Sequence, residues 1–186
     1  VKEAGLTTSL DMAAVDPDSD AGKADWGKIL EKVLPYVDYF VPSAEELCFM
    51  ADRPRYEEWM TRAAGGDVTS VISVEEDIRP LAKRVLDMGA SCLLIKCGAP
   101  GMYFTDGKKE IFERSYKPER VLSGTGAGDT SIAAFLKARM EGRSIEERLH
   151  LAAATGASSV EAYDALGGLR SFEELERRIN EGWEKL

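Results

Sequence analysis

Two kinds of hydrophobic pattern alternate along the chain. Short apolar runs such as Leu93-Leu94-Ile95 are typical of buried strands, whereas apolar residues three or four positions apart, as from Ile78 to Leu86, are typical of amphipathic helices. Strands that alternate with helices favour an α/β fold with a mostly parallel central sheet. The pattern predicts strands at 5–12, 39–41 and 93–95, a hairpin at 101–112, and helices at 25–36, 44–51, 56–63, 78–86, 129–141, 144–160 and 171–184.

Four helix starts carry a Ser-x-x-Glu sequence, in which the serine and the glutamate satisfy backbone amides of the first turn. The four pairs are Ser43/Glu46, Ser73/Glu76, Ser144/Glu147 and Ser171/Glu174. The stretch 52–70 is charged and irregular and contains Gly65-Gly66, so we expect a surface excursion with one short helix there.

Size and composition limit the classes of protein to consider. The chain has 186 residues, 44% hydrophobic and 31% charged, so we expect a single globular α/β domain over residues 1–186. A net charge of −9 argues against nucleic acid as a partner, because phosphate backbones require a basic surface. No apolar run approaches the roughly 18 residues of a membrane span. The first residue is Val1 rather than Met, which favours a fragment or a processed product.

Cysteine and histidine are too sparse for several kinds of site. The three cysteines lack Cys-x-x-Cys spacing, so they fit neither a zinc site nor a disulfide framework and indicate reduced thiols in the cytoplasm. The single histidine, His150, has no nucleophile motif near it in the sequence.

The segment with the clearest chemistry is LSGTGAGDT at 122–130, which precedes an amphipathic helix. Glycines let the backbone approach a ligand closely, and the free amides and the dipole of a helix N-terminus favour an anion. Asp129 is either an acidic first-turn residue that stabilises the helix or a base placed beside bound phosphate. The spacing excludes a dinucleotide fingerprint, whose sixth position would be Asp129, and a Walker A loop, which needs a lysine.

A G-x-G-x-G loop of the methyltransferase type does match Gly124, Gly126 and Gly128. This match leaves an S-adenosylmethionine-binding methyltransferase as one alternative. Such a loop normally opens its domain, however, and less than a third of this chain follows Asp129. Those residues have a helical pattern, which argues against the strands that should come after the loop.

The sequence GTGAGDT followed by SIAAFL resembles the C-terminal signature of the PfkB, or ribokinase-like, carbohydrate kinases. Other segments resemble family elements in the expected order: LTTSLDM a mid-chain strand ending in Asp, VDYFVPSAEEL the strand, turn and helix with the Asn-x-x-Glu motif, and LLIKCGAPGMYF the nucleotide-contacting strand and turn. The resemblance covers nearly the whole chain, but only the C-terminal portion of the family. It implies a three-layer αβα fold with a mostly parallel sheet, truncated at the N-terminus.

The resemblance implies a role for each matching residue. Asp129 matches the catalytic base that takes the proton of a sugar hydroxyl, and Gly126, Ala127 and Gly128 match the anion hole that faces the transferred phosphoryl group. Glu46 matches the glutamate that helps to place Mg²⁺ through water. The implied nucleotide-binding residues are Lys96, Gly98, Gly101, Thr125 and Ala153.

The sequence departs from the family pattern in three places. Ser43 stands where the family motif has asparagine, so Ser43 and Glu46 can equally form a capping box that needs no metal. The triplet 123–125, Ser-Gly-Thr, replaces the family's Asp-Thr-Thr, whose aspartate commonly belongs to a monovalent-cation site, and this puts potassium activation in doubt. No N-terminal Gly-Gly motif for the sugar is present.

The resemblance implies ATP-dependent phosphorylation of the hydroxyl of a sugar or sugar-like alcohol, with ATP and Mg²⁺ as cofactors and a cytoplasmic location. Because the sugar pocket of the family comes mostly from its N-terminal part, we expect this chain to bind nucleotide better than it catalyses. A non-catalytic nucleotide-binding module is the second alternative. The expected partners are a nucleotide and a small sugar, with no nucleic acid and no membrane. A homodimer stays open, since family members often pair through N-terminal lid strands that this chain does not match.

Overall fold

A computed structural model describes residues 1–186 as two compact units. The first unit comprises Val1–Gly98 and Tyr103–Phe112, and the second comprises Ala99–Met102 and Glu113–Leu186. The single-domain organisation expected from the sequence stays a prediction.

A five-stranded sheet has the strand order β1-β2-β3-β4-β5. Strands β1 (Ser9–Leu10), β2 (Tyr39–Phe40) and β3 (Leu93–Lys96) pair in parallel. Strands β4 (Gly101–Thr105) and β5 (Glu110–Arg114) follow through connections too short for a parallel crossover, so they are antiparallel neighbours. The predicted α/β class, the parallel strands and the hairpin around Asp106-Gly107 are therefore confirmed.

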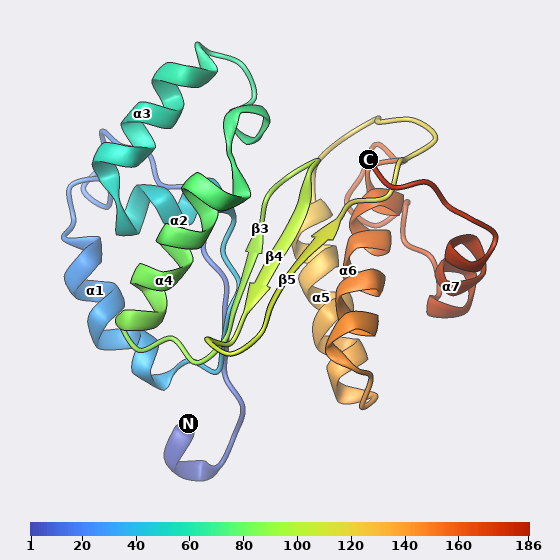
Figure 1. Ribbon diagram of the computed structural model, residues 1–186, viewed down its shortest axis with the longest axis horizontal. Helices are drawn as coiled ribbons and strands as arrows, with labels where there is room; N and C mark the ends of the chain where they lie inside the picture. The colour runs from blue at the N-terminus through green and yellow to red at the C-terminus, as the bar shows by residue number, and fades with distance from the viewer. The chain divides into compact units, whose positions relative to one another are not determined.

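Helices cover the strands of the first unit. Helices α1 (Trp26–Val33), α2 (Ala44–Ala51) and α4 (Arg79–Asp87) lie on one side of the sheet, and α3 (Arg53–Ala63) projects beyond them (Figure 1). Their apolar faces form one core with Phe40, Leu93 and Ile95 of the strands. A 3-10 helix at Lys2–Ala4 precedes β1, and single turns connect the later elements: 3-10 helices at Leu34–Tyr36 and Val68–Val71, and a π-helical turn at Val74–Ile78.

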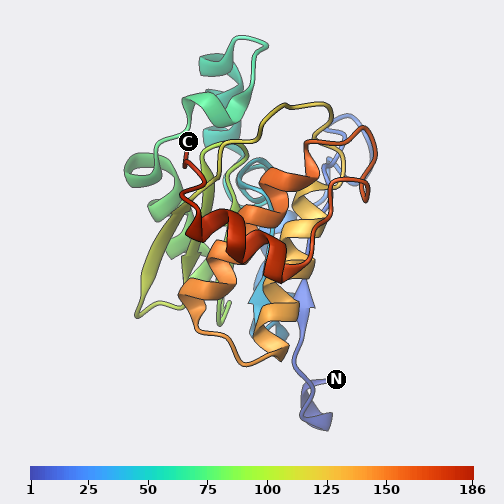
Figure 2. The same cartoon turned by 90° about the vertical axis from the view of Figure 1, so that its right-hand side faces the viewer.

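The second unit is mainly helical and contains α5 (Ala127–Met140), α6 (Ile145–Ser159) and α7 (Phe172–Asn180). Helices α5 and α6 run side by side, and α7 lies across α6 (Figure 2). A Cβ added at Gly156 on α6 would lie 2.4 Å from the hydroxyl oxygen of Ser131 on α5. A glycine at this position therefore allows the two helices to approach closely, and it fixes how α5 and the turn before it are held.

Three predicted elements differ from the structure. The strand expected over 5–12 pairs only at Ser9–Leu10, because Asp38 binds the amide and the hydroxyl of Thr8 next to it. The last helix ends at Asn180 rather than at 184, because Gly182 adopts a φ of 91° that breaks the helix. Helix α3 begins three residues earlier than expected, at Arg53, where Asp52 caps it.

The four Ser-x-x-Glu sequences all mark the start of a helical segment. Ser43/Glu46 and Ser144/Glu147 form complete capping boxes. In Ser73/Glu76 and Ser171/Glu174 only the serine accepts a hydrogen bond from an amide of the first turn.

None of the helices combines the length and the apolar character that crossing a bilayer requires.

Candidate functional site

In the second unit, α5 begins directly at the glycine-rich turn. Gly126 is the N-cap residue and has φ 79° and ψ −4°, a left-handed conformation that favours glycine. A Cβ at Gly126 would lie 2.6 Å from the Cβ atom and 3.0 Å from the Cα atom of Ala165. Both the backbone conformation and the lack of space therefore require glycine here. Helix α5 starts two residues before the predicted position 129, so Ala127 and Gly128 belong to its first turn.

The backbone amides in the first turn of α5 have no carbonyl within the helix to which they can donate a hydrogen bond. Ala127 N–H donates to the carbonyl of Gly124 (3.2 Å), and Thr130 N–H donates to that of Gly126 (2.9 Å). No side chain caps this helix, whereas α1, α2, α3, α6 and α7 are each capped by a serine or an aspartate. The amides of Gly128 and Asp129 lie at the positive end of the helix dipole, where an anion is stabilised.

Asp129 is the acidic residue of this first turn, and its side chain is exposed. The two residues that follow direct their hydroxyls to the backbone: Thr130 donates to the carbonyl of Gly126 (2.9 Å) and Ser131 to that of Ala127 (2.7 Å). The structure thus places a carboxylate, a proton acceptor, on the same helical turn as amides suited to an anion. Gly126, Ala127, Gly128 and Asp129 form the N-cap and the first turn of α5, and their roles as anion hole and base stay predictions.

The other predicted nucleotide residues of the second unit have less specific surroundings. Thr125 is exposed, and its amide donates to the hydroxyl of Ser123 (3.1 Å). Gly101 has a φ of 133°, and a Cβ there would lie 2.1 Å from the carbonyl oxygen of Glu113, so the hairpin alone requires this glycine. Ala153 is 3% exposed within α6. The roles of these residues in nucleotide binding stay predictions.

In the first unit, residues at the carboxyl ends of the three parallel strands lie together. Lys96 ends β3, and its ammonium donates to both carboxylate oxygens of Asp11, which follows β1 (2.7 and 2.9 Å). The backbone of Lys96 also forms a parallel bridge with Ser43, after β2. This edge of an open α/β sheet is where such folds bind ligands. The Lys96 side chain is only 14% exposed, so it is an ion-paired group rather than a freely solvated one.

Glu46 lies at the same edge, at the start of α2. Its Oε2 accepts the amide of Ser43 (2.8 Å), and the Ser43 hydroxyl accepts the amide of Glu46 (3.2 Å). The capping box therefore exists, and the structure pairs only one of the two oxygens of Glu46. No group of three or more His, Cys, Asp or Glu side chains is arranged to hold a metal directly. The role of Glu46 in placing Mg²⁺ through water, which the resemblance implies, stays a prediction.

Gly98 joins this edge to the surface excursion. Gly98 has a φ of 70°, and a Cβ there would lie 2.7 Å from the Cγ2 atom of Thr69. Sequence reasoning missed this contact, the Asp11–Lys96 pair and the approach of Ala165 to Gly126. Each one joins residues far apart in the chain, and no local pattern indicates them.

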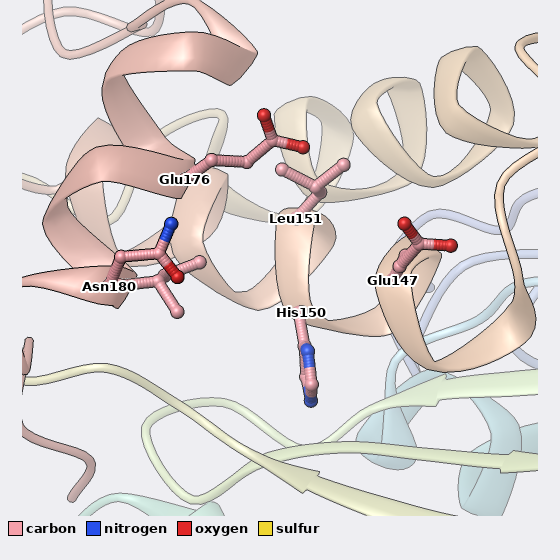
Figure 3. A pocket seen from close by; sticks show the side chains of 6 residues that line it. Glu147, His150, Leu151, Glu176 and Asn180 are labelled. Carbon is pink, nitrogen blue, oxygen red and sulfur yellow. The ribbon is translucent and has the colours of Figure 1, made fainter.

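A pocket of about 250 Å³ lies between α6 and α7, away from all the predicted site residues (Figure 3). Its two carboxylates are already ion-paired with Arg143, which lies 3.4 Å from Glu147 and 3.1 Å from Glu176. Its lining residues are Glu147, His150, Leu151, Glu176, Ile179 and Asn180. Both carboxylates of the pocket are therefore neutralised, and none of the predicted site residues lines it.

The chain is similar in sequence to known proteins. Residues 7–170 match the model of the pfkB family carbohydrate kinases. The chain is 26% identical over 166 residues to an uncharacterized sugar kinase of Archaeoglobus fulgidus and 28% identical over 167 residues to a ribokinase of Arabidopsis thaliana. It spans 88% and 89% of its own length in these matches, but only 56% and 37% of the two relatives.

The solved structure of Arabidopsis thaliana ribokinase, complexed with ribose and ATP, is similar with a TM-score of 0.71 and 24% sequence identity. The match covers 95% of this chain and 48% of that one, and it shows the ribokinase-like fold that the sequence predicts. The matched range includes the glycine turn, Asp129 and the strand ends described above. The chain belongs to the pfkB family of carbohydrate kinases.

Proposed function

We propose that this chain carries the nucleotide-binding and catalytic part of an ATP-dependent kinase that phosphorylates the hydroxyl of a sugar or sugar-like alcohol. One observation carries the proposal: the first turn of α5 combines uncapped amides at Gly128 and Asp129 with the exposed carboxylate of Asp129. Family membership supports the same reaction. Since the chain spans about half or less of its relatives, the acceptor and the activity of the whole protein belong to the proposal.

The chemistry assigns a separate task to each group. Asp129 accepts the proton of the attacking hydroxyl as its oxygen forms a bond to the γ-phosphorus and the bond from that phosphorus to the leaving ADP oxygen breaks. The anion hole is formed at Gly126, Ala127 and Gly128, and its free amides, those of Gly128 and the neighbouring Asp129, stabilise charge on the phosphoryl oxygens. Phosphoryl transfer depends mainly on positioning and electrostatics, so a rigid turn suits the task.

The remaining assignments follow the family resemblance. Lys96, Gly98, Gly101, Thr125 and Ala153 contact the nucleotide, and Glu46 helps to hold Mg²⁺ through water. When bound, Mg²⁺ neutralises phosphate charge. The unpaired oxygen of Glu46 supports its assignment. We also propose a cytoplasmic location, which is supported by three cysteines that form no disulfide, and we leave homodimer formation as a prediction.

The proposal is tested by calorimetric titration of the 186-residue chain with ATP, with and without Mg²⁺, followed by an assay for ADP release. The assay uses a panel of pentoses, hexoses and sugar phosphates, with ribose included because the related Arabidopsis thaliana structure contains it. S-adenosylmethionine serves as the competing ligand in a parallel titration. Asp129→Asn is the active-site variant, and Glu141→Gln, an exposed acid past the other end of α5, is its control.

Three outcomes separate the alternatives. Mg²⁺-dependent ATP binding, together with sugar-dependent ADP release that Asp129→Asn removes and Glu141→Gln does not, would support the kinase. ATP binding that no acceptor alters, without any phosphoryl transfer even when the longer protein is assayed, would favour the non-catalytic nucleotide-binding module. Binding of S-adenosylmethionine without binding of ATP would contradict the proposal.

A further inference from the structure

The connection 115–123, which leads from β5 to the glycine turn, lies outside the strands of the sheet. Three of its amides donate to the two residues that follow α6. Leu122 and Ser123 donate to the carbonyl of Val160 at 2.8 and 3.4 Å. Glu119 donates its amide to Oε1 of Glu161 at 2.9 Å. Two consecutive residues after α6 therefore fix the path of the chain immediately before the turn.

Glu161 is itself held in place by α7. The Arg178 guanidinium approaches Oε1 of Glu161 at 3.3 Å and Oε2 at 3.4 Å. The side chains of Arg178 and Glu161 are only 18% and 11% exposed. A two-point, partly desolvated pair of this kind is stronger and more directional than a surface ion pair. The carboxylate that binds Glu119 is thus fixed by a residue of a different helix.

The C-terminal residues Trp183 and Glu184 also contact the connection 115–123. The Trp183 ring lies 3.7 Å from the Arg178 guanidinium and 4.9 Å from the ring of Tyr116. The Trp183 indole donates to the carbonyl of Lys117 (2.7 Å), and the amide of Lys117 donates to the carbonyl of Glu184 (2.8 Å). Figure 1 shows the C-terminal residues returning to this connection. The connection is therefore held along its length by α6, α7 and the C-terminal tail.

We infer that Glu161 is a positioning residue for the glycine turn. Held by Arg178, its carboxylate fixes the amide of Glu119, close to Leu122 and Ser123, whose amides the carbonyl of Val160 holds. Through this connection it sets the direction of the amides at Gly128 and Asp129. Only Gly124 and Thr125 separate Ser123 from the N-cap residue Gly126, so a shift of the connection passes directly into the turn. The inference rests on the proposed function for the statement that these amides meet phosphate.

The test compares Glu161→Gln with Glu176→Gln, an isosteric change at another carboxylate of the second unit. Glu176 pairs with Arg143 at 3.1 Å and contacts nothing in the connection 115–123, so this variant controls for the loss of an ion pair. Hydrogen exchange of residues 117–131 and calorimetric binding of Mg-ATP are measured on the 186-residue chain, with circular dichroism as the check on folding. Arg178→Lys keeps the positive charge and serves as a second variant if Glu161→Gln fails to fold.

We expect Glu161→Gln to speed exchange at 119–129 and to weaken Mg-ATP binding roughly tenfold, the scale of an ordinary coupling between packed residues. Glu176→Gln should leave both unchanged, and Arg178→Lys should give a smaller effect than Glu161→Gln. Unchanged exchange in Glu161→Gln, or equal effects in the two glutamine variants, would overturn the inference. If the unsubstituted chain does not bind Mg-ATP, the proposed function fails instead, and the exchange comparison still decides the role of Glu161.

Discussion

The ammonium of Lys96 donates to both carboxylate oxygens of Asp11, at 2.7 and 2.9 Å, and so ties the end of β3 to the end of β1 across β2. The two partners are not equally buried: the Lys96 side chain is 14% exposed and that of Asp11 is 32% exposed. The amide of Met12 also binds Asp11 (2.8 Å). The pair thus holds a mostly buried positive charge at the edge where we propose that nucleotide binds.

This unequal burial predicts unequal losses of stability. Asp11→Asn leaves the buried Lys96 ammonium without a counter-ion and should lower the free energy of unfolding by about 2 kcal/mol. Lys96→Met leaves only the Asp11 carboxylate, whose side chain is 32% exposed and which water can reach, and should cost under about 1 kcal/mol. Urea denaturation of both single variants and of the double variant measures the difference. Equal losses in the single variants would show that burial of the lysine does not control the energy of the pair.

The local elements of this edge could be predicted, but the pair itself could not. Helix α2 begins at Ala44 and ends at Ala51, as expected, because the Ser43/Glu46 signal acts within one turn of helix. Asp11 and Lys96, by contrast, lie 85 positions apart. Their contact depends on the order of the strands, which a hydrophobic pattern does not specify.

The same distinction applies to the glycine turn. Its position before a helix, the left-handed residue and the acidic first turn follow from the GTGAGDT sequence. The neighbour of Gly126, Ala165, comes from a loop after α6 with no pattern of its own. Trp183 was expected inside a helix but lies in the C-terminal tail, because Gly182 ends the regular structure and the indole binds Lys117.

We expect substitution of Asp129 to affect the rate of phosphoryl transfer much more than the affinity for Mg-ATP. Asp129→Asn keeps the size of the side chain and the first-turn amides, so Mg-ATP affinity should change less than about threefold. Loss of a general base typically costs about 10²- to 10⁴-fold in rate, and we expect kcat to fall in that range. Steady-state ADP release with the best acceptor of the panel, together with calorimetry, measures both quantities. A variant that loses ATP binding and turnover together would point to a binding role for Asp129.

The requirement for glycine at 126 can be separated from a general need for flexibility. Gly126→Ala places a methyl group against Ala165 and forces alanine into a left-handed conformation, which alone costs about 1–2 kcal/mol. We expect a larger total loss of stability and at least tenfold weaker Mg-ATP binding. Gly124→Ala is the control, because a Cβ at Gly124 has nothing within 4 Å. Thermal unfolding and calorimetry of both variants give the comparison, and equal effects would contradict the steric explanation.

Asp77 predicts a loss of stability in acid. Burial raises its pKa, but hydrogen bonds from Ser73 N–H, the Trp59 indole and Arg62 outweigh burial and hold the pKa below 3.8. A carboxylate with a lowered folded-state pKa contributes stability above its unfolded-state pKa of about 3.9, and this contribution is lost as the pH falls through the folded-state value. Stability should therefore decline below about pH 4.

The matching substitution is Asp77→Asn, which keeps an oxygen for Trp59 but removes the charge opposite Arg55 and Arg62, which lie 3.0 and 3.4 Å from Oδ1 of Asp77. At pH 7 we expect a loss of about 2 kcal/mol, because both arginines still reach solvent. The difference from the unsubstituted chain should shrink as the pH falls below about 4. Urea denaturation from pH 7 to pH 3 measures it, with the exposed Asp87→Asn as the control. A difference independent of pH would rule out the charge as its source.

Gly98 connects the surface excursion to the end of β3, and its substitution tests that contact. Gly98 (φ 70°) and Gly65 (φ 83°) are both left-handed, but a Cβ at Gly65 would have nothing within 4 Å, whereas one at Gly98 would overlap Thr69. Alanine at either position carries the same backbone strain of about 1–2 kcal/mol. Any further loss in Gly98→Ala therefore measures the displacement of Thr69. We expect Gly98→Ala to cost at least 1 kcal/mol more than Gly65→Ala, by the usual scale of an overpacked contact. Thr69→Ser in the Gly98→Ala background removes the Cγ2 methyl group and should recover part of that difference in urea denaturation. If stability is not recovered, the segment 52–70 moves away when Gly98 is replaced, and the contact of Thr69 does not hold Gly98 in place.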